Sequence, residues 1–333
     1  MDFDFDAAVQ SPFRMQPGLR RLAPGATQLT PTVALHRGAA RHLREKLAVL
    51  GAFAADALCQ VPGFDAAPAL AALSAQAAAE HPSAWVQEGN ACRALGLGWA
   101  LDGHGVPHDI GSGHGRDDGA TFSAQHSDWP EIGPLLRQLP VEWRQAALLS
   151  LAFAEDFVIV DARSGTLPWL AVALPSSWAP TDKLGRSFAE VHAPVADNRL
   201  IVGAADHLLR LVTGADRWER FVWTITPHPR LHAHPARRDP AGWPAQLHGD
   251  ELAAQAWFRS ERQTFIPVPG MDQAVFNIGV DVQPLAQVAD RPERAQRLHD
   301  ALASMSDAVL AYRGLTPVRD HLLRWLASRA GTP

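Results

Sequence analysis

Two spacings of apolar residues follow one another along the chain and predict helices on either side of a strand-rich middle. Apolar residues recur every three or four positions over 38–55, 66–79 and 140–153, which predicts three helices in the first half of the chain. The same spacing over 292–313 and 317–329 predicts two closing helices. A sheet is therefore expected between these two groups.

The middle of the chain has the spacing of strands. Two segments at 157–161 and 169–174 are rich in residues that favour strands. They flank a Ser-Gly turn and predict a hairpin. Further strands are predicted at 220–226, 259–266 and 274–282. We therefore expect an α+β fold with about five strands, mostly antiparallel, and helices that cross one face of the sheet.

Two segments are predicted to be irregular. Residues 1–35 are rich in Pro, Gly and Thr and predict an arm on the surface, while 102–122 are rich in Gly and His and predict a long loop. The chain then divides into three expected parts: an N-terminal arm with helical decoration over 1–140, a core over 141–290, and C-terminal helices packed on that core over 291–333.

Composition indicates a soluble globular protein. Of the 333 residues, 47% are hydrophobic and 20% are charged. A net charge of −5 gives no basic patch, so we expect no nucleic acid partner. The chain begins with acidic residues, carries no leader pattern, and has no run of about 18 apolar residues. We therefore expect a cytoplasmic protein without membrane contact.

Histidine and cysteine give only weak signals of metal binding. Most of the 15 histidines lie among Gly and Pro, as at 102–115 and 227–235. They could form a metal cluster, but solvated loop histidines are favoured because none forms a pair four residues apart on a predicted helix beside a carboxylate. Cys59 and Cys92 are too few for a disulfide framework and fit a reducing compartment.

The segment 175–198 predicts a strand end, a turn and a short helix. Four residues share one face of that helix: Leu184, Phe188, Val191 and His192. Pro194 has no N–H and ends the helix, and Asp182 or Thr181 is the expected cap at its start. An imidazole beside an apolar wall suits a ligand of a flat, metal-bearing cofactor such as haem. A core histidine bonded to backbone is the alternative interpretation.

The strand at 259–265 places several charges close together. Strand alternation puts Arg259, Glu261 and Gln263 on one face, and Ser260, Arg262 and Thr264 on the other. The functional interpretation is a lined pocket, in which Glu261 receives an amine or relays a proton and Arg262 pairs with a carboxylate. The alternative is a solvated edge strand with an internal Glu–Arg pair.

Four segments, in order, resemble the DUF3445 family, whose characterised member is a haem-dependent oxidative N-demethylase. PSSWAPTDKLGRSFAEVHAPV at 175–195 is similar to a signature of Pro-Ser-Gly-Trp, then Lys-Leu-Gly, then Ile-His-x-Pro-Val-Pro. AEDFVIV at 154–160 resembles the family's Gln-Glu-Asp-Phe strand, and RSERQTF at 259–265 its Arg-x-Glu-Arg-Gln-Thr-Leu strand. PFRMQPGLRRL at 12–22 echoes the N-terminal part of the family.

The resemblance implies a PAS-like sheet that holds haem b, with His192 as the iron ligand and Glu261 as the catalytic residue that orients an ammonium. It also implies Trp178, Lys183 and Arg262 as cofactor-binding residues, although tryptophans at such junctions are more often plain core. The implied substrates are O2 and a small alkylamine such as dimethylamine. The expected site is a pocket between the helix at 183–192 and the strands of the sheet.

Electrons would come from a separate flavin and iron–sulfur reductase subunit, as in the family's multi-subunit enzyme. The chain itself has neither a Gly-rich dinucleotide fingerprint nor enough cysteines for an iron–sulfur cluster. A cysteine thiolate could also hold haem, but the residues around Cys59 and Cys92 do not resemble the loop of thiolate-ligated monooxygenases.

Three departures from the family pattern keep other functions open. Ala196 replaces a proline, Val222 an asparagine, and Gly279 the arginine that begins an Arg-Thr-Tyr run. Polar groups that could touch a cofactor or substrate are therefore absent. The alternatives are a haem-binding sensor or store without turnover, and a divergent member of the family that has lost haem and binds another small ligand.

Overall fold

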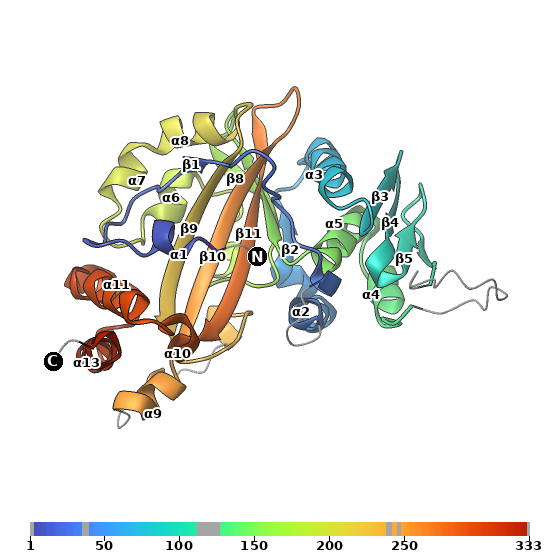
Figure 1. Cartoon of the computed structure of the whole chain (residues 1–333). Coiled ribbons are helices and arrows are strands. Elements are labelled where there is room, and N and C mark those ends of the chain that lie inside the picture. The colour runs from blue at the N-terminus through green and yellow to red at the C-terminus, as the bar shows by residue number, and fades with distance from the viewer. Residues whose placement is uncertain (1–2, 35–39, 112–126, 238–241, 245–247, 332–333) are drawn as a thin grey trace.

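The structure is a computed structural model, and it describes residues 3–34, 40–111, 127–237, 242–244 and 248–331. One sheet of seven strands runs through its centre (Figure 1). In spatial order its strands are β1 (Arg20–Arg21), β9 (Trp218–Thr226), β10 (Trp257–Pro267), β11 (Gln273–Pro284), β7 (Asp156–Asp161), β8 (Thr166–Ala171) and β2 (Leu58–Gln60). Every neighbouring pair is antiparallel.

The five predicted strands are all present. β7 and β8 form the predicted hairpin, and Gly165 at its turn has φ 70°, which suits glycine because it has no side chain. β9, β10 and β11 form the longest ladders of the sheet. The N-terminal arm adds β1 at one edge, where Arg20 and Arg21 pair with Glu219 and Trp218.

One face of the sheet is covered by the crossover from β8 to β9. It contains a 3-10 turn (Pro180–Asp182) and the helices α6 (Phe188–His192), α7 (Arg199–Gly203) and α8 (Ala205–Val212). Val212 of α8 packs against Phe265 and Ala274 of the sheet. Phe265 shares its face of β10 with Glu261, because residues an even number apart point to the same side. The crossover helices therefore lie over the face that carries Glu261.

The opposite face is also covered, in addition to the one face that the crossing helices were predicted to occupy. Trp223 and Phe258 point to this face and belong to a second hydrophobic cluster with the C-terminal helices. These are α9 (Gly249–Ala254), α10 (Leu285–Val288), α11 (Pro292–Ala303), α12 (Asp307–Tyr312) and α13 (Arg319–Ala330). The central strands have apolar side chains on both faces, and each face needs a cover to exclude water.

The N-terminal half holds three predicted helices and one unpredicted sheet. α2 (Arg41–Ala57), α3 (Ala67–Glu80) and α5 (Val141–Ala152) match the predicted spans, with α1 (Phe5–Ala8) and α4 (Ile132–Gln138) in addition. A four-stranded sheet consists of β3 (Trp85–Glu88), β4 (Ala91–Ala94), β5 (Trp99–Leu101) and β6 (Pro107–Asp109). The predicted loop over 102–122 begins as the turn between β5 and β6 and includes β6, and its residues 112–122 lie outside the described residues.

Two predicted helices have different bounds in the structure. α6 begins only at Phe188, because Ser187 and Glu190 form a capping box, so neither Asp182 nor Thr181 is its cap. The predicted helix over 292–313 is two helices, since the Ser306 hydroxyl accepts the backbone N–H of Val309 and starts α12 anew.

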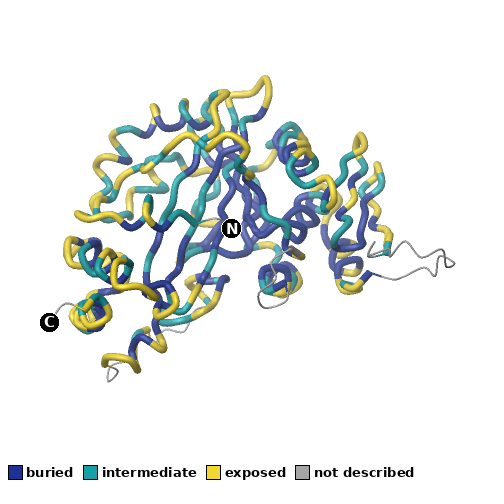
Figure 2. Tube along the Cα trace, viewed as in Figure 1, coloured by how far each residue is buried: buried dark blue, intermediate teal, exposed yellow. Residues whose placement is uncertain are grey.

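The largest hydrophobic cluster joins the N-terminal half to the main sheet. It includes Leu43 of α2, Trp85 of the small sheet and Phe157 of β7, each almost fully buried. Figure 2 shows this burial along the central strands and α5, whereas α7 and the outer turns are exposed. Among the residues that the structure describes, no helix has the length and apolarity to cross a membrane.

Candidate functional site

His192 is the last residue of α6, and its two ring nitrogens have different environments. Nδ1 lies 2.8 Å from the carbonyl oxygen of Phe188, one turn earlier. A carbonyl only accepts, so Nδ1 carries the proton and Nε2 keeps its lone pair. Within the described part of the chain, Nε2 has no hydrogen-bond partner. The backbone thus satisfies one nitrogen of the imidazole and leaves the other available to a ligand.

Burial holds His192 in its neutral form. Burial lowers the pKa of His192 to about 4, with smaller contributions from the positive charges of Arg220 and Lys183 and against the opposing effect of the Phe188 carbonyl. A metal binds the neutral imidazole, so no proton has to be displaced from His192 near neutral pH.

Apolar side chains and the Lys183 cation lie in the segment around α6. Leu184, Phe188, Val191 and Trp178 are partly buried against the main hydrophobic cluster. Lys183 donates from Nζ to the carbonyl oxygen of Val191 at 3.0 Å, and burial lowers its pKa. The structure therefore brings two of the predicted cofactor-binding residues, Trp178 and Lys183, to the segment that carries His192.

Glu261 lies in the middle of β10 with both carboxylate oxygens engaged. Ser176 donates its hydroxyl to Oε1, and Gln263 donates from Nε2 to Oε2 at 2.6 Å. Its cross-strand neighbours are Val222 on β9 and Val280 on β11. Val222, one of the three departures from the family pattern, thus stands directly beside the predicted catalytic carboxylate.

Arg259 anchors the loop that leads to α6, a role that sequence reasoning missed. Its guanidinium is buried and donates to the Ser176 hydroxyl at 2.8 Å and to the Leu231 carbonyl at 2.8 Å. It also donates to the carbonyls of Leu174, Pro175 and Arg230. The Ser176 hydroxyl accepts a hydrogen bond from Arg259 and donates one to Glu261, so Ser176 connects the loop to β10.

Arg262 lies on the opposite face of β10, away from His192 and Glu261. Its guanidinium forms an ion pair with Glu219 at 2.9 Å and donates to the Thr27 carbonyl at 2.7 Å. The strand alternation predicted this separation of Arg262 from Glu261. The structure gives Arg262 a protein carboxylate as its partner.

Arg220 is a further cation on the Glu261 face that sequence reasoning did not single out. It stands opposite Gln263 in the β9–β10 ladder. Its Nε is buried and has no hydrogen-bond partner. Alternation along β9 was the signal that could have placed Arg220 and Val222 on the same face as Glu261.

The other metal-binding interpretations find no support in the described residues. No group of three or more His, Cys, Asp or Glu side chains there is arranged to hold a metal ion. Cys59 and Cys92 are free and buried, and burial raises their pKa values to about 11 and about 12. Both thiols are therefore protonated at neutral pH, and they lie on β2 and β4 rather than beside α6.

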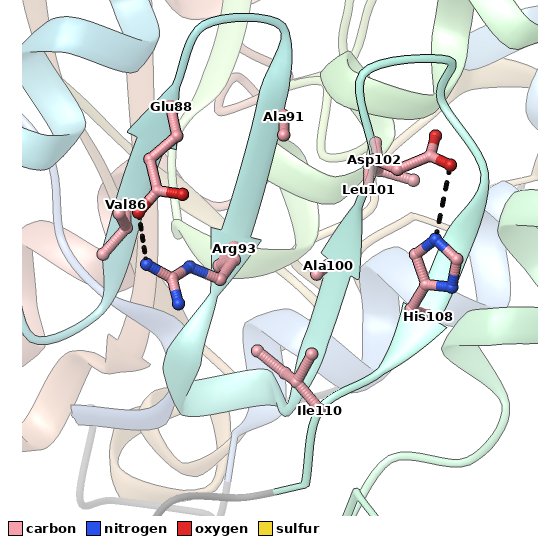
Figure 3. Close-up of a pocket in the computed structure, with 9 residues that line it drawn as sticks. All are labelled: Val86, Glu88, Ala91, Arg93, Ala100, Leu101, Asp102, His108 and Ile110. Carbon is pink, nitrogen blue, oxygen red and sulfur yellow. Dashed lines mark hydrogen bonds and ion pairs between the residues drawn. The ribbon is translucent and has the colours of Figure 1, made fainter.

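Two surface hollows lie away from this site. One, of about 290 Å³, covers the open face of the four-stranded sheet, where Ala91 and Ala100 leave space between two ion pairs, Arg93–Glu88 and His108–Asp102 (Figure 3). The other, of about 250 Å³, lies between α9 and α13. Neither of these two lies at the expected position between α6 and the strands.

A comparison with known families matches the part of the chain that holds these residues. A family model described as haem-dependent oxidative N-demethylase, alpha subunit-like, matches residues 135–323, which is more than half of the chain. The match includes β7 to β11, and with them His192 and Glu261, and excludes the four-stranded sheet. The chain therefore belongs to the haem-dependent oxidative N-demethylase alpha subunit-like family.

Proposed function

We propose that the protein is a haem-binding oxygenase subunit that removes a methyl group from a small alkylamine such as dimethylamine. The observation that carries this proposal is His192, a neutral imidazole whose Nδ1 is fixed by a backbone carbonyl and whose Nε2 is free. Fixing one ring nitrogen by hydrogen bonding orients the other toward a metal, as in other histidine-ligated sites.

The residues around His192 fit haem b. Nε2 would hold the iron, while Trp178 and Phe188 supply apolar surface for a porphyrin and Lys183 supplies a positive charge. The connectivity also supports a PAS-like core over 141–290. When the five strands from β7 to β11 are numbered one to five along the chain, their spatial order in the sheet is 2-1-5-4-3. When bound, haem supplies the activation of O2 and the oxidising power that amino acid side chains lack.

Glu261 is our candidate for holding the substrate. A secondary amine is a cation near neutral pH, and a carboxylate in a partly buried position offsets the cost of removing that cation from water. Ser176 and Gln263 fix the carboxylate in one orientation, and Val222 and Val280 keep its flanks apolar. Glu261 would hold the ammonium proton and direct the methyl group to one position.

The overall reaction consumes the amine, O2, two electrons and two protons, and it yields formaldehyde, the demethylated amine and water. We propose a separate reductase subunit, of flavin and iron–sulfur type, as the electron source. The alpha subunit-like family implies a partner subunit. The two buried cysteines of this chain are too few to hold an iron–sulfur cluster.

A haem-binding sensor or store without turnover is the second candidate. It is favoured by Val222, which places an apolar side chain beside Glu261 where the family pattern has an asparagine. A site with fewer polar groups orients an amine less well. In both functions His192 would hold the iron.

One spectroscopic experiment separates these functions. The purified protein, supplied with haem b, is expected to show a Soret band that shifts on reduction with dithionite. With O2, a reductant and dimethylamine, an oxygenase forms formaldehyde, whereas a sensor or store shows the band without product. A protein that binds no haem under these conditions would contradict both functions and leave a family member with another ligand.

A further inference from the structure

Arg220 is a partly buried cation that no carboxylate of the described residues contacts directly. The structure gives it no hydrogen bond and no ion pair within the described residues, and its Nε is fully buried. Burial lowers its pKa, against the opposing charge of Glu261. Withdrawing a guanidinium from water without a partner is costly, so such a group normally pairs with an anion.

The two neighbouring arginines of β10 have hydrogen-bond or ion-pair partners, and Arg220 differs from them in this. Arg259 has five acceptors on the same face, and Arg262 has Glu219 on the other. Glu261 is a diagonal neighbour of Arg220 across the β9–β10 ladder, at a spacing of roughly 7–8 Å for such pairs. Its two oxygens accept from Ser176 and Gln263, and neither makes a hydrogen bond to Arg220.

We propose that Arg220 receives a carboxylate of the bound ligand, and this inference rests on the proposed function. A guanidinium matches a carboxylate because its N–H groups form a planar fork. Arg220 is near enough to His192 for its charge to act on the imidazole, and it lies beside Glu261 on one face. The carboxylate is either a haem propionate or part of the substrate, which would then be an N-methylated amino acid held by Glu261 and Arg220 together.

The first arm of the test compares haem b with its dimethyl ester, which has no free propionate. The apoprotein is titrated with each, and the dissociation constants are read from the Soret band. The parent is expected to bind haem b at least about tenfold more tightly than the ester, the scale of one charge-assisted hydrogen bond. Arg220→Gln should bring this ratio close to one, whereas Arg163→Gln, the control at an exposed arginine paired with Asp272, should leave it unchanged.

The second arm tests the substrate as the source of the carboxylate. Calorimetry measures the binding of N-methylglycine and dimethylamine to the parent and to Arg220→Gln. A loss of at least about tenfold for N-methylglycine alone assigns the carboxylate to the substrate. Arg220→Lys keeps the positive charge but not the planar pair of N–H donors. Its affinity for N-methylglycine should lie between those of the parent and of Arg220→Gln.

The outcomes separate the inference from the proposed function. The inference is overturned if Arg220→Gln changes neither the haem-to-ester ratio nor the preference for N-methylglycine. A parent that shows no Soret band with either porphyrin contradicts the proposed function. In that case the calorimetric comparison of the parent with Arg220→Gln still tests whether Arg220 binds a carboxylate. If Arg220→Gln does not fold, equal affinity of the parent for haem b and its ester, together with no binding of N-methylglycine, overturns the inference.

Discussion

At the scale of single residues, the site depends on which polar atoms are already satisfied. His192 has one bonded and one free nitrogen, Glu261 has two bonded oxygens, and Arg220 has an orphan Nε. A free lone pair on a neutral imidazole suits a metal, and a free N–H on a buried cation suits an anion. The unsatisfied atoms therefore indicate where a ligand would be held.

Replacing His192 by alanine tests the iron ligand. His192→Ala removes the only ligand that we assign and one backbone hydrogen bond, which contributes about 1 kcal/mol. We expect the fold to persist and haem retention to be lost, with partial recovery of the Soret band when imidazole is added. His207→Ala, at an exposed position of the neighbouring helix α8, is the control and should retain haem. Full haem loading and an unchanged spectrum in His192→Ala would exclude this residue as the ligand.

Replacing Glu261 by glutamine tests the site for the amine. The change keeps the shape and removes the charge, so amine binding should weaken by about 1–3 kcal/mol, the scale of a lost charge-assisted hydrogen bond. The measurement is the shift of the haem spectrum as dimethylamine is added. Asp281→Asn, on the opposite face of the adjacent strand, should leave the affinity unchanged. Equal affinity in the parent and in Glu261→Gln would mean that Glu261 has a structural role.

At the scale of elements, the crossover that carries His192 is thinly packed. α6 has no buried residue, α7 buries only Ile201, and Leu200 is 60% exposed. Few buried contacts imply a low local free energy of opening. This weak packing permits the α6–α7 segment to open, and we expect haem binding to make use of that opening.

Removing the cap of α6 should therefore weaken haem binding. Ser187→Ala removes the capping box and costs about 1 kcal/mol of local helix stability. Amide hydrogen exchange over 187–203 should be fast in the apoprotein, faster in Ser187→Ala, and slower once haem binds. Asp65→Ala removes a hydrogen bond to the backbone at the start of α3, where the carboxylate accepts the N–H of Ala67, and should not change haem affinity. Strong protection of 187–203 without haem would contradict the proposed opening.

The element scale also shows how far the sequence predicts this structure. Long segments with a clear spacing, such as β10 and α2, lie where predicted, because side-chain period alone distinguishes strand from helix. The four-stranded sheet was missed because its strands have only three or four residues, too few for a period to show. The partners of Arg259 and Arg262 are far away in the chain and follow from the fold alone.

At the scale of the whole molecule, a buried charge cluster connects the N-terminal helices to the main sheet. Lys46 of α2 is fully buried, lies 3.2 Å from a carboxylate oxygen of Asp156, and donates to the carbonyls of Phe153 and Glu155. The second oxygen of Asp156 accepts the N–H of Leu174 at 2.6 Å, at the start of the loop toward α6. Residues outside the family match thus support the strand on which the site depends.

Replacing Lys46 by methionine should destabilise the whole protein. The change leaves Asp156 as a buried charge without its cation, and breaking such a pair costs about 3–5 kcal/mol of the free energy of unfolding. Urea denaturation, followed by tryptophan fluorescence and by far-UV circular dichroism, measures this loss. The exposed pair Arg163–Asp272 is the control, and Arg163→Ala should leave the denaturation midpoint nearly unchanged. Since one hydrophobic cluster spans α2, the small sheet and β7, the two signals should change together. If Lys46→Met proved as stable as the parent, or if the two signals separated, the N-terminal half would be an independent attachment rather than part of the core that positions His192.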